Sequence, residues 1–226
     1  MNTLVESLVH QHVITSKTVK RVFLALDRRL FCPSKTDREV AYNDAPTDIG
    51  CQQTISAPHM HAICLEQCRI HLESLLAEQQ EDKTTIRILD VGSGSGFLTA
   101  AFALLLKEMG LLESQGKQVI GIEKYDALTT ASIGNVRKAI PEMLPHISLV
   151  TADAYTYDGH GLMFDFIHCG AAAEHIPQNL VRCLKQGGEM ILPLGPHRSV
   201  QYMTIVQKKE TLEQHTMMPV RYVPLD

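Results

Sequence analysis

Apolar residues recur at helical spacing in the first part of the chain and predict three helices. Two short helices are expected over residues 3–13 and 16–26, with Ser16 placed to cap the second. A longer helix is expected to begin at Ser56-Ala57-Pro58, with the serine as its cap, and to run to about Glu78. Residues 34–53 lie between them and contain turn-forming glycine, proline and asparagine, so this stretch is predicted to be mainly loop.

From residue 86 the pattern changes to short apolar runs that alternate with helical segments. Strands are predicted at 86–91, 119–122, 147–150, 164–167 and 190–193, and helices after Gly96, over 126–140 and at 178–184. This alternation is typical of βαβ units, and the nearly continuous apolar runs indicate a parallel sheet covered by helices on both faces. The closing segments 202–206 and 217–223 alternate apolar and polar residues and predict antiparallel strands at one edge. The predicted fold is therefore a three-layer α/β/α domain with a mostly parallel sheet.

The composition fits one globular domain over residues 1–226. Hydrophobic residues make up 45% of the chain, which is enough for a sizeable core and argues against disorder. The net charge of -4 and the absence of a basic run do not favour nucleic acid or an anionic membrane as a partner. No stretch has the length and hydrophobicity of a membrane span or a secretory signal. A cytosolic protein is expected.

The six cysteines do not form a disulfide framework, because they are spread through a long chain and most lie in apolar segments. A metal site is not expected either. His61, Cys64, Cys68 and His71 lie near one helical face, but a rise of 1.5 Å per residue separates the ends of this set by about 15 Å. One zinc ion needs all its ligands within roughly 2.0–2.3 Å.

The candidate chemistry begins at a glycine loop, residues 90–96, between a predicted strand and a predicted helix. Its sequence, Asp-Val-Gly-Ser-Gly-Ser-Gly, has the spacing G-x-G-x-G. The dinucleotide fingerprint requires G-x-G-x-x-G, the P-loop requires Gly-Lys-Ser/Thr, and the hydrolase elbow requires a serine where Gly94 stands. What remains matches the first motif of Rossmann-like methyltransferases, and the cosubstrate is then S-adenosylmethionine.

Acidic residues follow three successive predicted strands and support this interpretation. Asp90 precedes the glycines, Glu123 ends the second strand and Asp153 follows the third. Ligands of open parallel sheets bind at the carboxyl ends of the strands. We expect Asp90 and the loop amides to bind the amino-acid end of the cosubstrate, Glu123 to bind the ribose hydroxyls and Asp153 to bind the adenine amino group.

Several further blocks resemble the protein-L-isoaspartate O-methyltransferase family. The most specific is Thr54-Ile55-Ser56-Ala57-Pro58-His59-Met60-His61-Ala62, and Ile167 to Ala173, Leu184 to Gly188, Ile191 to Pro196 and Tyr222 to Leu225 agree in order. The resemblance covers essentially the whole chain. It implies a class I methyltransferase fold and a repair enzyme that methylates the free α-carboxylate of isoaspartyl residues in damaged proteins. Residues 1–55 would contribute to the substrate site, and a monomer is expected.

The resemblance also assigns roles to individual residues. Ser56 is implied to hold the substrate carboxylate, although its position alone also fits a helix cap. The remaining implied substrate-site residues are Thr54, Ile55, Ala57 and His59. The implied cosubstrate-site residues are His61, Asp90, Gly92, Ser93, Gly94, Ser95, Gly96, Glu123, Lys124, Asp153, Ala154 and Cys169. A carboxylate acceptor is ionised at neutral pH, so it needs alignment rather than a general base.

Two departures from the family pattern bear on these roles. Ala152 and Ala154 flank Asp153 where the family usually has glycines, which is expected to shift this loop. The Tyr-Val-Pro-Leu block is followed here by Asp226 rather than threonine, and this carboxylate is expected to weaken substrate binding. Two other functions stay open at this point. One is a non-catalytic adaptor on the same fold, and the other is a small-molecule methyltransferase.

Overall fold

The computed structural model describes residues 2–78, 85–114, 116–196 and 199–225. Its centre is a seven-stranded sheet with the order β5-β4-β3-β6-β7-β8-β9. The strands are β3 (Ile88–Val91), β4 (Val119–Glu123), β5 (Ile147–Thr151), β6 (Phe164–Cys169), β7 (Leu184–Leu194), β8 (Gln201–Lys208) and β9 (Leu212–Val220). The first five in spatial order are parallel and the last two are antiparallel. The mostly parallel sheet with antiparallel C-terminal strands is confirmed.

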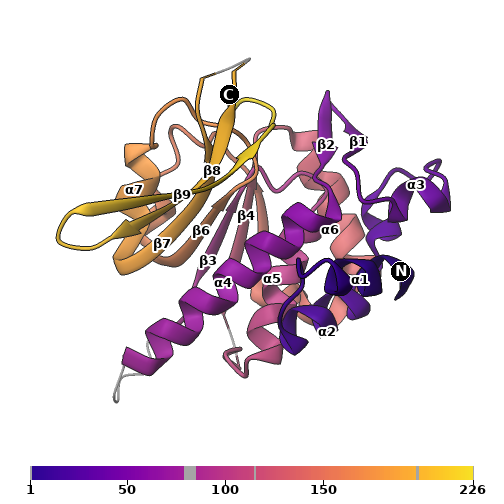
Figure 1. Ribbon diagram of the computed structural model, residues 1–226, viewed down its shortest axis with the longest axis horizontal. Helices are drawn as coiled ribbons and strands as arrows, with labels where there is room; N and C mark the ends of the chain where they lie inside the picture. The colour runs from indigo at the N-terminus through magenta and orange to yellow at the C-terminus, as the bar shows by residue number, and fades with distance from the viewer. Residues whose placement is uncertain (1, 79–84, 115, 197–198, 226) are drawn as a thin grey trace.

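Helices cover both faces of this sheet, as the continuous apolar strands predict. They are α1 (Asn2–His10), α2 (Lys17–Ala25), α4 (Pro58–Glu78), α5 (Phe97–Glu108), α6 (Asp126–Ala139) and α7 (Gln178–Cys183). One core joins α1, α2, α4, α5 and part of α6 to one face, and a second core joins α7 to the other. Figure 1 shows α4 lying obliquely across the sheet beside α1 and α2, with α7 at the opposite, left-hand side of the view. The N-terminal helices therefore share the core of the sheet.

The Ser16 cap lies where the sequence predicts it, whereas α4 and β7 begin at residues other than those expected. Ser16 caps α2, because its hydroxyl accepts a hydrogen bond from the Val19 amide at 3.0 Å. The helix expected from residue 56 begins instead at Pro58, so Ser56 lies before it. Strand β7 begins directly at Leu184 rather than after the paired glycines that follow it.

The prediction that residues 34–53 are mainly loop was incomplete. This stretch contains helix α3 (Arg38–Tyr42) and most of an antiparallel hairpin of β1 (Thr47–Gly50) and β2 (Gln53–Ile55). Both elements are too short to show a hydrophobic period. The turn between the strands has positive φ angles at Gly50, Cys51 and Gln52, and nothing but the glycine announces such a turn in the sequence.

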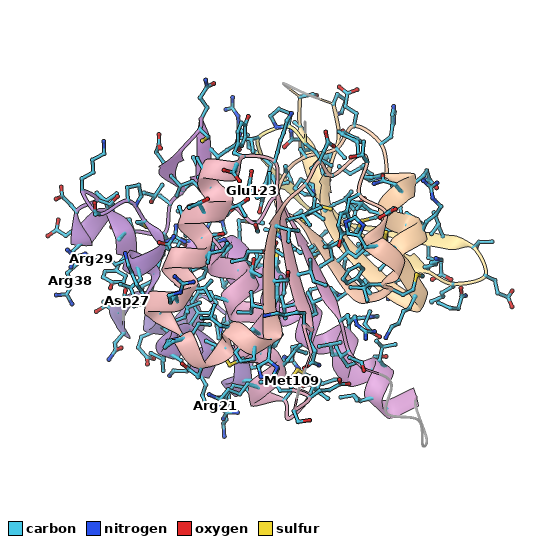
Figure 2. The ribbon with its side chains drawn as sticks, turned by 180° about the vertical axis from the view of Figure 1, so that it is seen from behind. Arg21, Asp27, Arg29, Arg38, Met109 and Glu123 are labelled. Atoms are coloured by element: carbon cyan, nitrogen blue, oxygen red, sulfur yellow. The ribbon has the colours of Figure 1, made fainter. Side chains whose placement is uncertain are left out.

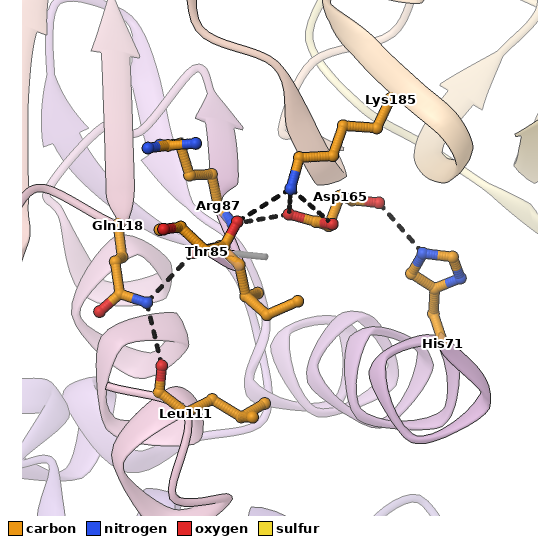
Figure 3. Close-up of polar contacts among 8 residues, drawn as sticks. His71, Thr85, Arg87, Leu111, Gln118, Asp165 and Lys185 are labelled. Atoms are coloured by element: carbon orange, nitrogen blue, oxygen red, sulfur yellow. Dashed lines mark hydrogen bonds and ion pairs between the residues drawn. The ribbon is translucent and has the colours of Figure 1, made fainter. Parts of the chain in front are cut away.

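A buried polar cluster fixes the amino ends of the central strands (Figure 3). The Asp165 carboxylate accepts hydrogen bonds from Lys185 Nζ and the Arg87 amide, each at 2.8 Å. The Asp165 carbonyl lies 3.0 Å from His71 Nε2, and Gln118 Nε2 donates to the Leu111 carbonyl at 3.0 Å. These contacts join α4, β6 and β7 at the edge opposite the glycine loop, so that loop stands on a rigid scaffold. Within the described residues, no helix has the length and apolar character needed to cross a bilayer.

Candidate functional site

A cavity of about 450 Å³ opens at the carboxyl ends of β3, β4 and β6. This volume lies within the usual range for small-molecule sites, and its position is the one expected for a parallel sheet. The end of β3 and the glycine loop form its floor, the segment before α4 forms one wall, and residues 218–225 form another. Predicted site residues that line it are Thr54, Ser56, Ala57, His59, Gly92, Gly94, Glu123, Lys124 and Ala154.

The glycine loop is held by β4 and needs its glycines. The amides of Gly92 and Ser93 both donate to the Ile122 carbonyl, at 2.9 and 3.0 Å. Gly92, Gly94 and Gly96 all have positive φ angles, which side chains with a Cβ rarely adopt. Of the loop, Gly92 and Gly94 reach the cavity, whereas Ser93, Ser95 and Gly96 are buried and do not line it.

Glu123 joins the glycine loop to the end of β4. Its carboxylate accepts hydrogen bonds from the Gly94 amide at 2.9 Å and from the Tyr125 amide at 3.1 Å. The side chain lines the cavity, and Figure 2 shows Glu123 near the ends of the central strands. A carboxylate oxygen can accept two hydrogen bonds, and each oxygen of Glu123 accepts one from the backbone. Glu123 therefore keeps acceptor capacity for hydroxyl groups of a ligand.

Asp90 has partners that the sequence did not reveal. Its residue is only 1% exposed, and it does not line the cavity. Its two oxygens accept from Thr99 Oγ1 at 2.5 Å and contact His168 Nδ1 at 2.8 Å. Asp90 and His168 are register partners on adjacent parallel strands, so their side chains point to the same face and meet there. In this structure the Asp90 carboxylate is bound to residues behind the glycine loop and does not face the cavity. Direct contact between Asp90 and a ligand stays a prediction.

Three other predicted residues lie beside the cavity rather than on its wall. Asp153 is exposed, and its carboxylate accepts from the Tyr155 amide at 2.7 Å, while the neighbouring alanines line the cavity. Cys169 is fully buried in the second core, and burial raises the pKa of its thiol far above the usual value. Ile55 is 4% exposed and packs in the first core.

The substrate-side wall contains Ser56 and an ion pair. Ser56 lies before the first turn of α4 and lines the cavity. Tyr222 lines the same cavity, and burial raises the pKa of its phenol. Asp44 Oδ1 lies 2.9 Å from both the amide and Nδ1 of His59. These contacts fix the start of α4, just after Ser56.

The C-terminal wall was missed as a site. Residues 218–225, which run from the last residues of β9 into the following segment, line the cavity. The Ala172 amide donates to the Val223 carbonyl at 2.8 Å, and the Ala172 carbonyl accepts from the Leu225 amide at 2.7 Å. Gln201 binds Tyr222 on both its amide and its carbonyl. The only signal in the sequence was the family-like block Tyr222 to Leu225, to which no role was given. Asp226 lies outside the described residues.

His61 is buried beneath the wall and does not line the cavity. It stacks on Phe97, with ring centres 4.9 Å apart, and its Nδ1 lies 3.5 Å from the Arg28 guanidinium. Burial and the Arg28 charge hold the pKa of His61 well below its usual range. Among the described residues, no group of three or more His, Cys, Asp or Glu side chains is arranged to hold a metal ion.

The site fits S-adenosylmethionine in its shape and chemistry. Gly92 and Gly94 expose backbone to the cavity, Glu123 offers acceptors for hydroxyl groups, and Ile122, Ala152 and Ala154 provide apolar surface for a base. A Cβ on Gly170 would lie 3.0 Å from the Gly92 carbonyl oxygen, so small residues keep this floor open. The fold and the site define a class I S-adenosylmethionine-dependent methyltransferase.

The chain belongs to the protein-L-isoaspartate(D-aspartate) O-methyltransferase family, which it matches over residues 1–226. Protein-L-isoaspartate O-methyltransferase 2 of Arabidopsis thaliana is 40% identical, over 98% of this chain and 66% of the relative. Protein-L-isoaspartate O-methyltransferase 1 of the same plant is 36% identical, over 98% and 89%. A solved structure from Plasmodium falciparum, assigned to the same activity and in complex with S-adenosyl-L-homocysteine, is 30% identical. It covers 99% of this chain and 97% of its own, with a TM-score of 0.82.

Proposed function

We propose that this enzyme transfers the methyl group of S-adenosylmethionine to the free α-carboxylate of L-isoaspartyl residues in damaged proteins. Family membership supports the reaction, and the observation that carries it to particular residues is the shared cavity. Ser56, from the family-like block before α4, faces the same cavity as Gly92, Gly94 and Glu123. A donor on the glycine loop and an acceptor at Ser56 would therefore meet.

On the donor side, Glu123 would hold the ribose hydroxyls and the Gly92–Gly94 backbone would hold the amino-acid end. When bound, S-adenosylmethionine supplies a sulfonium methyl group, which passes to a carboxylate oxygen and leaves S-adenosylhomocysteine. Lys124 and Ala154 line the same part of the cavity, which supports their roles as contacts. Asp90 would act through the loop that it supports, together with His168 and Thr99.

On the acceptor side, the enzyme needs alignment more than acid–base chemistry. The α-carboxylate has a reference pKa of about 3.3–3.7 and is ionised at neutral pH. Ser56 would donate its hydroxyl hydrogen to one carboxylate oxygen and leave the other free to attack. Tyr222 lines the same cavity as Ser56, which places a second side-chain hydroxyl on this wall. Thr54, Ala57 and His59 line the cavity and would contact the substrate backbone. Because the cavity opens at the protein surface, flexible and exposed isoaspartyl sites in many proteins would be the favoured substrates.

We further place the enzyme in the cytosol as a monomer that needs neither nucleic acid nor a membrane. Its cysteines Cys32, Cys51, Cys64, Cys68, Cys169 and Cys183 are all free thiols, as expected in a reducing compartment. The net charge of -4 supports the absence of a nucleic-acid partner.

The test is a methylation assay with labelled S-adenosylmethionine and two peptides that differ only in isoaspartate or aspartate at one position. We expect labelling of the isoaspartyl peptide alone, as a base-labile methyl ester. Equal, negligible labelling of both peptides would overturn the proposal. Binding of S-adenosylhomocysteine without turnover would then favour an adaptor. Labelling of small carboxylates that persists in Ser56→Ala would favour a small-molecule methyltransferase.

A further inference from the structure

Arg28 is a buried cation that forms no close ion pair within the described residues. The residue is 2% exposed, and within the described part of the chain its guanidinium forms no ion pair. Its Nε donates to the Ala41 carbonyl at 3.1 Å, Nη2 donates to the Ala45 carbonyl at 3.5 Å, and its charge lies 5.7 Å from the centre of the Phe97 ring. The Asp44 carboxylate acts on this charge from beyond ion-pair distance. A buried charge without a close counter-ion is costly, so a functional reason for it is worth seeking.

The remaining contact of Arg28 determines the chemistry of His61. Nη1 of Arg28 lies 3.5 Å from Nδ1 of His61. A guanidinium has only donors, so Nδ1 must be the acceptor and carry no proton. A second proton on this ring would place two cations side by side in a buried site. His59 and His168 add further positive charge around the ring when they are protonated.

We propose that Arg28 is a positioning residue that holds His61 as the neutral tautomer with its proton on Nε2. His61 does not line the cavity, but within the described residues its Nε2 forms no hydrogen bond and is not among the fully enclosed unpartnered atoms, so the N–H keeps some access to a ligand. Phe97, the first residue of α5 after the glycine loop, stacks on the ring and fixes its plane. The ligand class is a carboxylate, the one at the amino-acid end of the cosubstrate. This inference rests on the proposed cosubstrate site.

Arg28 also ties this tautomer to the substrate wall. Ala41 and Ala45, whose carbonyls it binds, flank the segment that carries Asp44, and Asp44 in turn holds His59. One side chain thus connects the loop before β1 to the start of α4. The tautomer of His61 and the position of residues 41–45 therefore depend on the same guanidinium group.

The tautomer is measured directly by a long-range ¹H–¹⁵N correlation spectrum of protein labelled at histidine, with His61 assigned from His61→Ala. We expect an unprotonated Nδ1, a protonated Nε2 and no titration between about pH 5.5 and 8, where an ordinary histidine titrates. In Arg28→Met we expect His61 to titrate or to mix both tautomers, and in Arg28→Lys to keep the Nε2–H form. A proton on Nδ1 in the wild type, or an unchanged spectrum in Arg28→Met, would overturn the proposal.

Calorimetry with S-adenosylhomocysteine tests the consequence for binding. Arg28→Met should weaken binding about 10- to 100-fold, the usual effect of losing a hydrogen bond to a charged group. The double variant with His61→Ala should bind no more weakly than His61→Ala alone, because both changes remove the same donor. Additive losses would overturn the proposal. The matched control is Arg29→Met, whose exposed side chain lies at the outer edge of the molecule in Figure 2 and should leave binding unchanged.

Neither measurement involves a methyl acceptor. Failure of isoaspartyl methylation with the expected spectrum and binding would therefore contradict only the proposed function, and the reverse result would contradict only the role of Arg28.

Discussion

Nδ1 of His168 lies 2.8 Å from Oδ1 of Asp90, directly behind the glycine loop and out of contact with the cavity. Burial opposes a charge on this imidazole, but Cys64 and the Asp90 carboxylate outweigh it and raise the pKa of His168 to about 10. The pair is therefore a buried ion pair at neutral pH, and it joins β3 to β6 at the point where the cosubstrate loop begins.

This ion pair predicts how stability depends on pH. The pKa of His168 is raised above its unfolded value of about 6.5, so its contribution to stability is complete below about pH 6.5. That contribution is lost as the pH rises towards about 10. The free energy of unfolding of the wild type minus that of His168→Gln should therefore shrink by a few kcal/mol, about 1.36 per pKa unit, between these limits. Urea unfolding at a series of pH values measures it, and a constant difference would contradict a raised pKa.

Ser56→Ala tests the acceptor side alone. Loss of one hydrogen bond to a carboxylate should lower kcat/KM for an isoaspartyl peptide about 10- to 100-fold. Affinity for S-adenosylhomocysteine should stay the same, because Ser56 is assigned to the other ligand. Steady-state kinetics and calorimetry separate the two effects, with Ser7→Ala on the exposed face of α1 as the control. A loss of cosubstrate affinity equal to the loss of activity would show that Ser56 serves the donor instead.

Glu123→Gln tests the donor side. The carboxylate accepts hydrogen bonds from the Gly94 and Tyr125 amides, and a glutamine would turn an NH₂ group towards one of them. We expect S-adenosylhomocysteine to bind about 10-fold or more weakly, since an unsatisfied donor costs roughly 1–3 kcal/mol. Calorimetry measures the change, and Glu39→Gln on the exposed side of α3 is the control. Unchanged affinity would remove Glu123 from the cosubstrate site.

Two glycines that look alike in the sequence should respond oppositely to alanine. A Cβ on Gly121 would lie 2.7 Å from Leu149 Cδ2 and 2.9 Å from Thr99 Oγ1, whereas a Cβ on Gly134 in α6 meets nothing within 4 Å. Gly121→Ala should lower the free energy of unfolding by about 1–3 kcal/mol through overpacking. Gly134→Ala should raise it by roughly 0.5–1 kcal/mol through helix propensity. Chemical denaturation checks both, and a stable Gly121→Ala would mean that this contact relaxes freely.

The sequence predicted what depends on local patterns. Continuous apolar strands, the Ser16 cap and the glycine spacing each have a short-range cause, and the sheet and helices followed from them. The hairpin of β1 and β2 was missed because its strands are too short for a period. Ser56 and Glu123, which the sequence singled out, both line the cavity, and their roles stay predictions.

Tertiary pairing explains the remaining differences in the site. Strand register brings His168 to Asp90, and the packing of α5 brings Thr99 to it, and no residue next to Asp90 reveals either contact. The partners of Arg28 likewise come from other elements, namely α3, the loop before β1 and the start of α4.

The wall formed by residues 218–225 makes the order of folding matter for activity. It lines the same cavity as Pro46, Ser56 and Gly92, which lie far from it along the chain. Bringing such distant segments together is entropically costly and therefore slow. A partly folded chain with β3 to β6 assembled, but with the β8–β9 hairpin undocked, would already have the glycine loop and still lack a complete acceptor pocket. Methyl transfer would then begin only after the β8–β9 hairpin has docked and the native topology is complete. Recovery of activity during refolding should lag behind recovery of the central sheet.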